Sequence, residues 1–255
     1  MTIRLCKRLP TSFERRRVLV SPRAYRRYWL RSLSNIHDDI LSAVLDWVLP
    51  GAVVWDVGAN CGVFTCAAAV TAGDRGKVFA FEADIQCADL IDRSRRLGSL
   101  GEAQITVCPM AISDVNSTVT FEISSYRSAA SSLEGFGRFE ATGSPCQVLS
   151  FRLDTLRQSI EPPSVLKIDV EGAEHLVLRG AKELLQRDRP ILICECSGGD
   201  VAVEINQILR DVEYHWRPMD AERDVEFTQN GITCSDIVAI PRENDRAPSL
   251  LSRAI

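Results

Sequence analysis

Two sets of residues in this 255-residue sequence have the types and spacing to do chemistry. The first is the segment Gly58-Ala59-Asn60-Cys61-Gly62, which follows a strand-like run at residues 53–57. Its two glycines let the backbone turn tightly and approach a ligand, and Asn60 tolerates a left-handed conformation. Amide groups at the start of the helix expected over residues 63–72 can then receive a negatively charged group. This pattern predicts a ligand-binding loop.

The second set consists of residues at the ends of later strands. Glu82 ends the second predicted strand, 24 residues beyond Gly58, about where a doubly wound nucleotide site places the acid that hydrogen-bonds a ribose diol. Ala111 follows the third strand, and Asp169 and Glu171 follow the fourth. Ligands of an open parallel sheet bind beyond the carboxyl ends of its strands. We therefore expect these residues to converge on one nucleoside.

Several other kinds of site are disfavoured. The glycine spacing does not match G-x-G-x-x-G, which argues against a nicotinamide or flavin dinucleotide, and no G-x-x-x-x-G-K-[ST] sequence exists for a nucleoside triphosphate. The chain has no CxxC pair and only three scattered histidines, so a zinc site has little to build with. The nine cysteines are odd in number, and several lie in apolar runs, which fits free thiols in a reducing compartment.

The elements that must position these residues alternate along the chain. From residue 51 onward, short β-branched runs alternate with helical patterns, which is typical of an α/β protein with a mostly parallel sheet. Strands are expected at 53–57, 77–82, 105–108, 164–169, 191–195, 214–217 and 236–240, and helices at 63–72, 85–97, 172–187 and 202–211. The alternating stretches 118–123 and 147–151 predict an antiparallel pair that frames a mobile loop over 124–145.

Composition sets the class of protein. The chain is 45% hydrophobic and 25% charged, as in a globular domain and unlike a disordered chain. No apolar run approaches the roughly 18 residues of a membrane span. No signal-peptide pattern opens the chain, so a secreted or membrane-spanning protein is disfavoured and a cytoplasmic location is expected.

The net charge of −4 hides a basic amino-terminal segment, because residues 1–31 hold ten of the 30 Lys and Arg and one acid, Glu14. This segment could contact nucleic acid, an anionic membrane surface or an acidic substrate. The favoured alternative is an amphipathic helix with solvated arginines. We expect a basic helical extension over 1–50, a main domain over 51–241 and a polar tail over 242–255.

Six strings closely resemble, in this order, the FkbM family of S-adenosylmethionine-dependent methyltransferases: VVWDVGANCGVFT, KVFAFEAD, AISD, FRLDTL, VLKIDVEGAEHLVLRGAKELL and RPILICE. The resemblance covers about residues 51–196, and KIDVEGAE is its most specific part. It implies a class I, Rossmann-like methyltransferase with a doubly wound, seven-stranded, mostly parallel sheet and helices on both faces. It also implies that S-adenosylmethionine lies across the loop 56–62, with its ribose held by Glu82. Transfer would go to an oxygen of a small molecule or sugar.

The resemblance also implies the site residues. Donor contacts are expected from Asp56, Gly58, Ala59, Asn60, Gly62, Thr65, Glu82, Ala83, Ala111 and Asp169. Ala83 stands where the family usually has proline, which costs some loop rigidity. Methyl transfer is an in-line displacement, so most catalysis should come from holding the acceptor near the methyl group. Asp169 or Glu171 would take the hydroxyl proton or orient the acceptor. Alternatively, Asp169 caps the next helix and Glu171 favours its positive end.

Three further features bear on the site. His175 lies off the apolar stripe of its helix and is expected to be exposed. Lys167, in an otherwise apolar strand, either pairs with a buried acid or reaches toward the site. Asp169, Glu171 and Glu195 supply oxygen ligands of the kind a divalent cation takes, but no metal is expected because such spacing is weak evidence.

Two other functions remain possible at this point. One is a nucleic-acid methyltransferase steered by the basic amino terminus, and the other is a non-catalytic scaffold that binds the donor. Amine methyltransferases of nucleic acid typically carry Asp/Asn-Pro-Pro-Tyr/Phe after the fourth strand, whereas this chain has Asp169-Val170-Glu171-Gly172. Nucleic acid is therefore the less favoured partner. Acceptor recognition is expected from the loop 124–145 and the amino-terminal helix.

Overall fold

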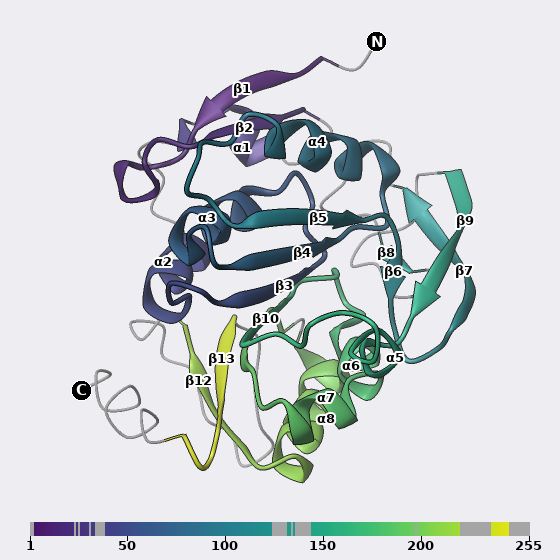
Figure 1. Ribbon diagram of the computed structural model, residues 1–255. Coiled ribbons are helices and arrows are strands. Elements are labelled where there is room, and N and C mark those ends of the chain that lie inside the picture. The colour runs from purple at the N-terminus through teal and green to yellow at the C-terminus, as the bar shows by residue number, and fades with distance from the viewer. Residues whose placement is uncertain are drawn as a thin grey trace.

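A seven-stranded sheet forms the centre of the protein in the computed structural model, with the strand order β12-β13-β11-β10-β3-β4-β5 (Figure 1). The structure describes residues 3–22, 24, 26–30, 32–33, 39–123, 132–133, 135, 144–196, 198–219 and 236–244. Six strands run parallel to one another, namely β3 (Val53–Val57), β4 (Lys77–Phe81), β5 (Gln104–Cys108), β10 (Val165–Ile168), β11 (Ile191–Cys194) and β12 (Tyr214–Pro218). Only β13 (Ile237–Pro241) opposes them within this sheet. The predicted doubly wound, mostly parallel sheet is confirmed.

Helices cover both faces of the sheet (Figure 1). One face packs against α2 (Asp39–Trp47), α3 (Val63–Ala72) and α4 (Ile85–Arg95), and the other against α5 (Leu153–Leu156), α6 (Glu174–Arg179), α7 (Lys182–Arg187) and α8 (Gly199–Asp211). Alternate strand residues enter the two cores, as Val54 and Trp55 do, because successive side chains of a strand point to opposite faces. Within the described ranges no helix combines the length and apolar character needed to cross a membrane.

A second, smaller sheet lies beyond the carboxyl ends of β4 and β5 (Figure 1). Its strands follow the order β6-β9-β7-β8, with β6 at Ala111–Ile112, β7 at Ser117–Ile123, β8 at Ser132–Leu133 and β9 at Ser144–Phe151. The antiparallel pairing of β7 with β9 confirms the prediction from alternation. Most of the loop expected over 124–145 lies outside the described residues. The small sheet packs Phe121 and Leu133 with Ala173 and Leu176, so it borders the segment that follows β10.

The amino-terminal segment differs from the expected helical extension. It begins with an antiparallel hairpin of β1 (Leu5–Arg8) and β2 (Arg17–Val20), joined through the 3-10 turn η1 (Thr11–Phe13), and α1 (Arg26–Leu30) follows. The expectation of a helix is therefore wrong over these strands. In β2, Val18 and Val20 are buried while Arg17 is exposed, which is the period of two typical of a half-buried strand.

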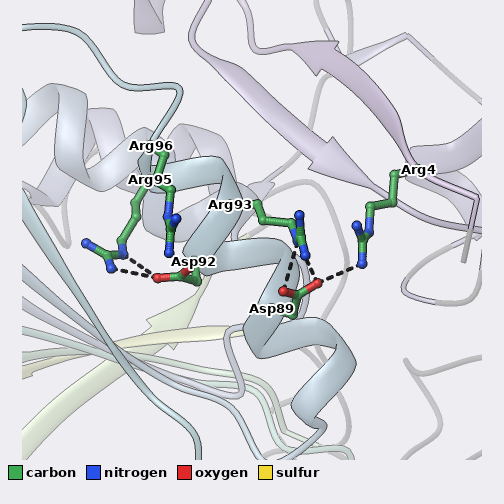
Figure 2. A network of polar contacts seen from close by, with 6 residues as sticks. All are labelled: Arg4, Asp89, Asp92, Arg93, Arg95 and Arg96. Carbon is green, nitrogen blue, oxygen red and sulfur yellow. Dashed lines mark hydrogen bonds and ion pairs between the residues drawn. The ribbon is translucent and has the colours of Figure 1, made fainter.

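One ion pair connects the residue before this hairpin to α4, and further pairs lie along α4 itself (Figure 2). Asp89 accepts hydrogen bonds from Arg4 at 2.8 Å and from Arg93 at 2.9 Å, and Asp92 binds the two arginines near the end of α4. These pairs are exposed, and such pairs contribute little stability individually. The Arg16–Glu102 pair is different, because both side chains are almost completely buried. The Nε of Arg16 lies 2.7 Å from Oε2 of Glu102.

The single helix expected over residues 172–187 is interrupted, so α6 and α7 are separate. A Cβ at Gly180 would lie 2.2 Å from the carbonyl oxygen of Ser113, so only glycine fits there. The Gly180 carbonyl accepts a hydrogen bond from the Asp154 amide at 2.9 Å, and the Asp154 side chain accepts one from the Leu184 amide in α7. Contacts from distant segments therefore end α6.

His175 in α6 is buried, so the expectation that it is exposed is wrong.

Candidate functional site

The glycine loop between β3 and α3 adopts the conformation that its residues allow. Gly58, Asn60 and Gly62 have φ values of 74°, 51° and 79°, so all three are left-handed. A Cβ at Gly58 would stand 1.8 Å from the carbonyl oxygen of Asp169. The loop is therefore pressed against the end of β10. The expected meeting of the first and fourth strand ends is seen directly in this contact.

Glu82 connects the glycine loop to the start of α4. Its Oε2 accepts a hydrogen bond from the Asn60 amide at 2.6 Å, and its Oε1 accepts one from the Asp84 amide at 2.7 Å. Burial raises the pKa of Glu82 to about 8, although both amides and the charge of Lys167 act in the opposite direction. Each carboxylate oxygen has a further lone pair, so ribose hydroxyls could still donate to it.

A second observation fits a polar ligand at this loop. The side-chain Oδ1 of Asn60 is buried and has no hydrogen-bond partner within the described part of the chain. Buried polar atoms of this kind are normally paired. Ala83 and Ala111 border the small sheet near Glu82, and Ala111 is buried. A carboxylate, an amide oxygen and an apolar wall in one place suit the ribose and base of a nucleoside such as that of S-adenosylmethionine.

Lys167 both pairs with a buried acid and reaches toward the glycine loop, so the two alternatives left open by the sequence hold together. Its ammonium group lies 3.1 Å from Oδ1 of the fully buried Asp56 and also donates to the Gly58 carbonyl at 2.7 Å. It lies 3.4 Å from Oδ2 of Asp169 as well. Burial opposes its charge, but the two carboxylates outweigh burial and raise the pKa of Lys167. The Thr65 hydroxyl donates to the other oxygen of Asp56 at 2.5 Å. This hydrogen bond connects the end of β3 to the start of α3, the two elements that flank the loop.

Three carboxylates gather at the ends of β10 and β11. Asp169, Glu171 and Glu195 each offer an oxygen, and these oxygens lie within 4.8 Å of one another. The side chain of Asp169 is 29% exposed, so it is open to a ligand while its other side faces Lys167. Glu171 has a left-handed backbone with φ at 57°. The group has the donor chemistry for a divalent cation, and the expectation of no metal stays a prediction.

The sequence analysis named most of these positions as candidates but left the part played by Lys167 undecided. The available signal was a lone lysine in a strand whose four residues are all buried. Cys61, also in the loop, is buried, and burial raises the pKa of its thiol to about 12. A neutral thiol agrees with the expectation that this residue needs only to be small.

A mostly parallel sheet with a glycine loop and an acid at successive strand ends is the arrangement of doubly wound nucleotide-binding folds, the class to which the Rossmann-like methyltransferases belong. The family described as Methyltransferase FkbM domain matches residues 56–215, so the chain belongs to the FkbM family of S-adenosylmethionine-dependent methyltransferases. Hexuronic acid methyltransferase AglP of Haloferax volcanii is 25% identical over 191 residues, which are 74% of this chain and 74% of that protein.

Solved structures that align with this chain include an O-methyltransferase and a fibrillarin. A S-adenosylmethionine-dependent O-methyltransferase from Thermotoga maritima has a TM-score of 0.49 and 13% identity, covering 88% of this chain and 72% of that one. Fibrillarin of Aeropyrum pernix, with natively bound S-adenosylmethionine, has a TM-score of 0.49 and 11% identity, covering 94% and 100%. Membership of the family rests on the sequence match and not on these likenesses.

Proposed function

We propose that this methyltransferase transfers the methyl group to a hydroxyl oxygen of a sugar. One observation carries the proposal: a single buried ammonium, that of Lys167, holds both the Gly58 carbonyl of the glycine loop and the carboxylate of Asp169. A proton acceptor is thereby fixed beside the loop proposed for the donor. The match to AglP, a hexuronic acid methyltransferase by name, supports a sugar as the acceptor.

The proposed donor site extends from the loop 56–62 to Glu82. The Glu82 carboxylate would accept the ribose hydroxyls, Asn60 would supply its buried side-chain oxygen, and Ala83 with Ala111 would form the wall for the base. When bound, S-adenosylmethionine supplies an electrophilic methyl group on a sulfonium that leaves as a neutral thioether.

Asp169 is proposed to accept the proton of the acceptor hydroxyl as the new C–O bond forms. Its partly exposed side chain is available for this, and Lys167 restricts the orientation of the carboxyl group. A base needs hydrogen-bond reach to the proton it removes, which a side chain at the rim can provide once the acceptor is bound. Glu171 is the second candidate, two residues farther along.

The test measures donor binding and turnover separately. Calorimetry with S-adenosylhomocysteine should show that Glu82→Ala abolishes donor binding. Asp169→Asn should keep that affinity but lower kcat about 100-fold in a radiolabel assay on sugar glycosides, the typical contribution of a positioned base. Asp46→Asn, at an exposed position of α2, is the matched control.

Two results would contradict the proposal. If Asp169→Asn weakens donor binding as much as it slows turnover, Asp169 belongs to the donor site and is not the proton acceptor. If the wild-type enzyme binds the donor and methylates no sugar hydroxyl across neutral and acidic glycosides, the acceptor class is wrong.

A further inference from the structure

A transverse row of paired residues connects Lys167 to the far side of the sheet. Lys167 pairs with Ile193 of β11, Ile193 with Val238 of β13, and Val238 with Arg217 of β12. Residues paired directly across strands place their side chains on the same face. Arg217 therefore lies on the face of the sheet that carries Lys167. Three strand spacings separate their Cα atoms by about 14 Å.

Arg217 also lies near the same edge of the sheet as the proposed site. β12 runs parallel to β10, and each strand has one more residue after the cation, Pro218 in β12 and Ile168 in β10. Ile193 and Val238 lie between the two cations and are buried in the core on this face, so a ligand that contacts both ends would lie beyond the carboxyl ends of the strands. An arginine side chain and one sugar ring together can bridge the distance from Arg217 to Asp169.

Within the described part of the chain, the guanidinium of Arg217 has no carboxylate partner of the kind that comparable arginines have. Arg217 is half-buried. Its Nε is buried and has no hydrogen-bond acceptor among the described residues, and its Nη1 donates to the Pro218 carbonyl at 3.3 Å. No carboxylate within the described ranges forms an ion pair with it, whereas Arg157 and Arg179 each have one. A buried N–H group without an acceptor is unfavourable, and a carboxylate of a ligand would supply the acceptor.

We propose that Arg217 binds the carboxylate of an acid-bearing sugar, the hexuronate class, and so orients the acceptor. This inference rests on the proposed function. A guanidinium presents two parallel donors that match a carboxylate. The carboxylates of Asp169, Glu171 and Glu195 would repel the acidic group of such a sugar. The three carboxylates repel the acidic group of the sugar and Arg217 attracts it. The sugar is thereby oriented with its neutral hydroxyls at Asp169 and its carboxylate at Arg217.

The experiment compares two probes, methyl glucuronide and methyl glucoside, on the full chain loaded with S-adenosylhomocysteine. Arg217→Gln should weaken glucuronide binding at least about tenfold, the range expected for a lost hydrogen bond to a charged group. The affinities for S-adenosylhomocysteine and for glucoside should not change. Arg217→Lys should restore part of the glucuronide affinity because it keeps the charge and loses the two-pronged geometry. Arg210→Gln, exposed on α8, is the control.

The outcomes separate this inference from the proposed function. Equal weakening of both sugars, or loss of S-adenosylhomocysteine binding in Arg217→Gln, would overturn it, since either marks a structural role. A wild-type protein that binds S-adenosylhomocysteine and does not distinguish glucuronide from glucoside would also overturn it. Glucuronide that binds in an Arg217-dependent way and is not methylated would support the carboxylate site and reject the proposed O-methylation.

Discussion

Replacing Glu82 with glutamine should remove a pH dependence from the stability of the donor-free protein. Burial raises the pKa of Glu82 from 4.5 to about 8. Between these values the folded chain keeps a proton that the unfolded chain has released. The free energy of unfolding therefore falls as pH rises through this window and stops falling above it. From about pH 5.5 to about pH 8.5 the Glu82 contribution to this loss is about 3 kcal/mol.

Urea unfolding followed by circular dichroism at both pH values measures the effect. Glu82→Gln resembles the protonated carboxyl in shape and cannot ionise, so relative to the wild type it should gain about 3 kcal/mol at the higher pH. Any fixed cost of changing the hydrogen bonds of Asn60 and Asp84 is the same at both pH values and cancels. Glu183→Gln, at an exposed position, should follow the wild-type curve. If wild type and Glu82→Gln respond to pH in parallel, the argument from burial is refuted.

Donor binding should respond in the opposite direction. Ribose hydroxyls that donate to Glu82 favour its ionised form, so binding of S-adenosylhomocysteine should release a proton below about pH 8. Its affinity should then rise with pH, by at most about tenfold per unit. Calorimetry in buffers of different ionisation enthalpy counts the protons, and uptake of a proton, or none, would contradict the proposed contact.

Two further substitutions test how the site and the amino-terminal hairpin are held. Gly58→Ala should abolish binding of S-adenosylhomocysteine, because its Cβ would lie 1.8 Å from the Asp169 carbonyl oxygen, whereas Gly51→Ala, also left-handed but with nothing within 4 Å, should cost only about 1 kcal/mol of strain. Normal donor binding by Gly58→Ala would show that the loop and strand end do not meet as described. Glu102→Ala leaves the buried Arg16 without its partner and should lower the free energy of unfolding by about 3 kcal/mol. Urea unfolding measures this free energy. A decrease of less than about 1 kcal/mol would contradict the argument from burial, because exposed ion pairs contribute no more than that.

Much of the framework follows from local pattern. The helix α3 begins and ends where its alanine-rich run and flanking glycines predict, and β3 and β4 coincide with short apolar runs. Because parallel strands share a carboxyl edge, Glu82 and Asp169 could be assigned to one region from their positions alone. Periodicity and strand direction are properties of the chain itself, so they can be read without a structure.

Long-range contacts decided the elements that the sequence misassigned. The arginine-rich amino-terminal segment forms a hairpin in which Val18 and Val20 are buried and β2 packs against α4. The helix after β10 was interrupted because Gly180 lies against Ser113 and Asp154 captures the start of α7. None of these partners is near in sequence, so no local window contains the competing interaction.

The site shows the same division. The positions of the carboxylates and glycines at strand ends can be read from the sequence, whereas Lys167 is identifiable there only as a charge in an apolar strand. Tertiary structure decided that its ammonium reaches Asp56, the Gly58 carbonyl and Asp169 together, and that Arg217 lies on the same face of the sheet. The physical reason is that a buried charge is defined by the groups that surround it, and those groups come from strands that meet only when the sheet is assembled.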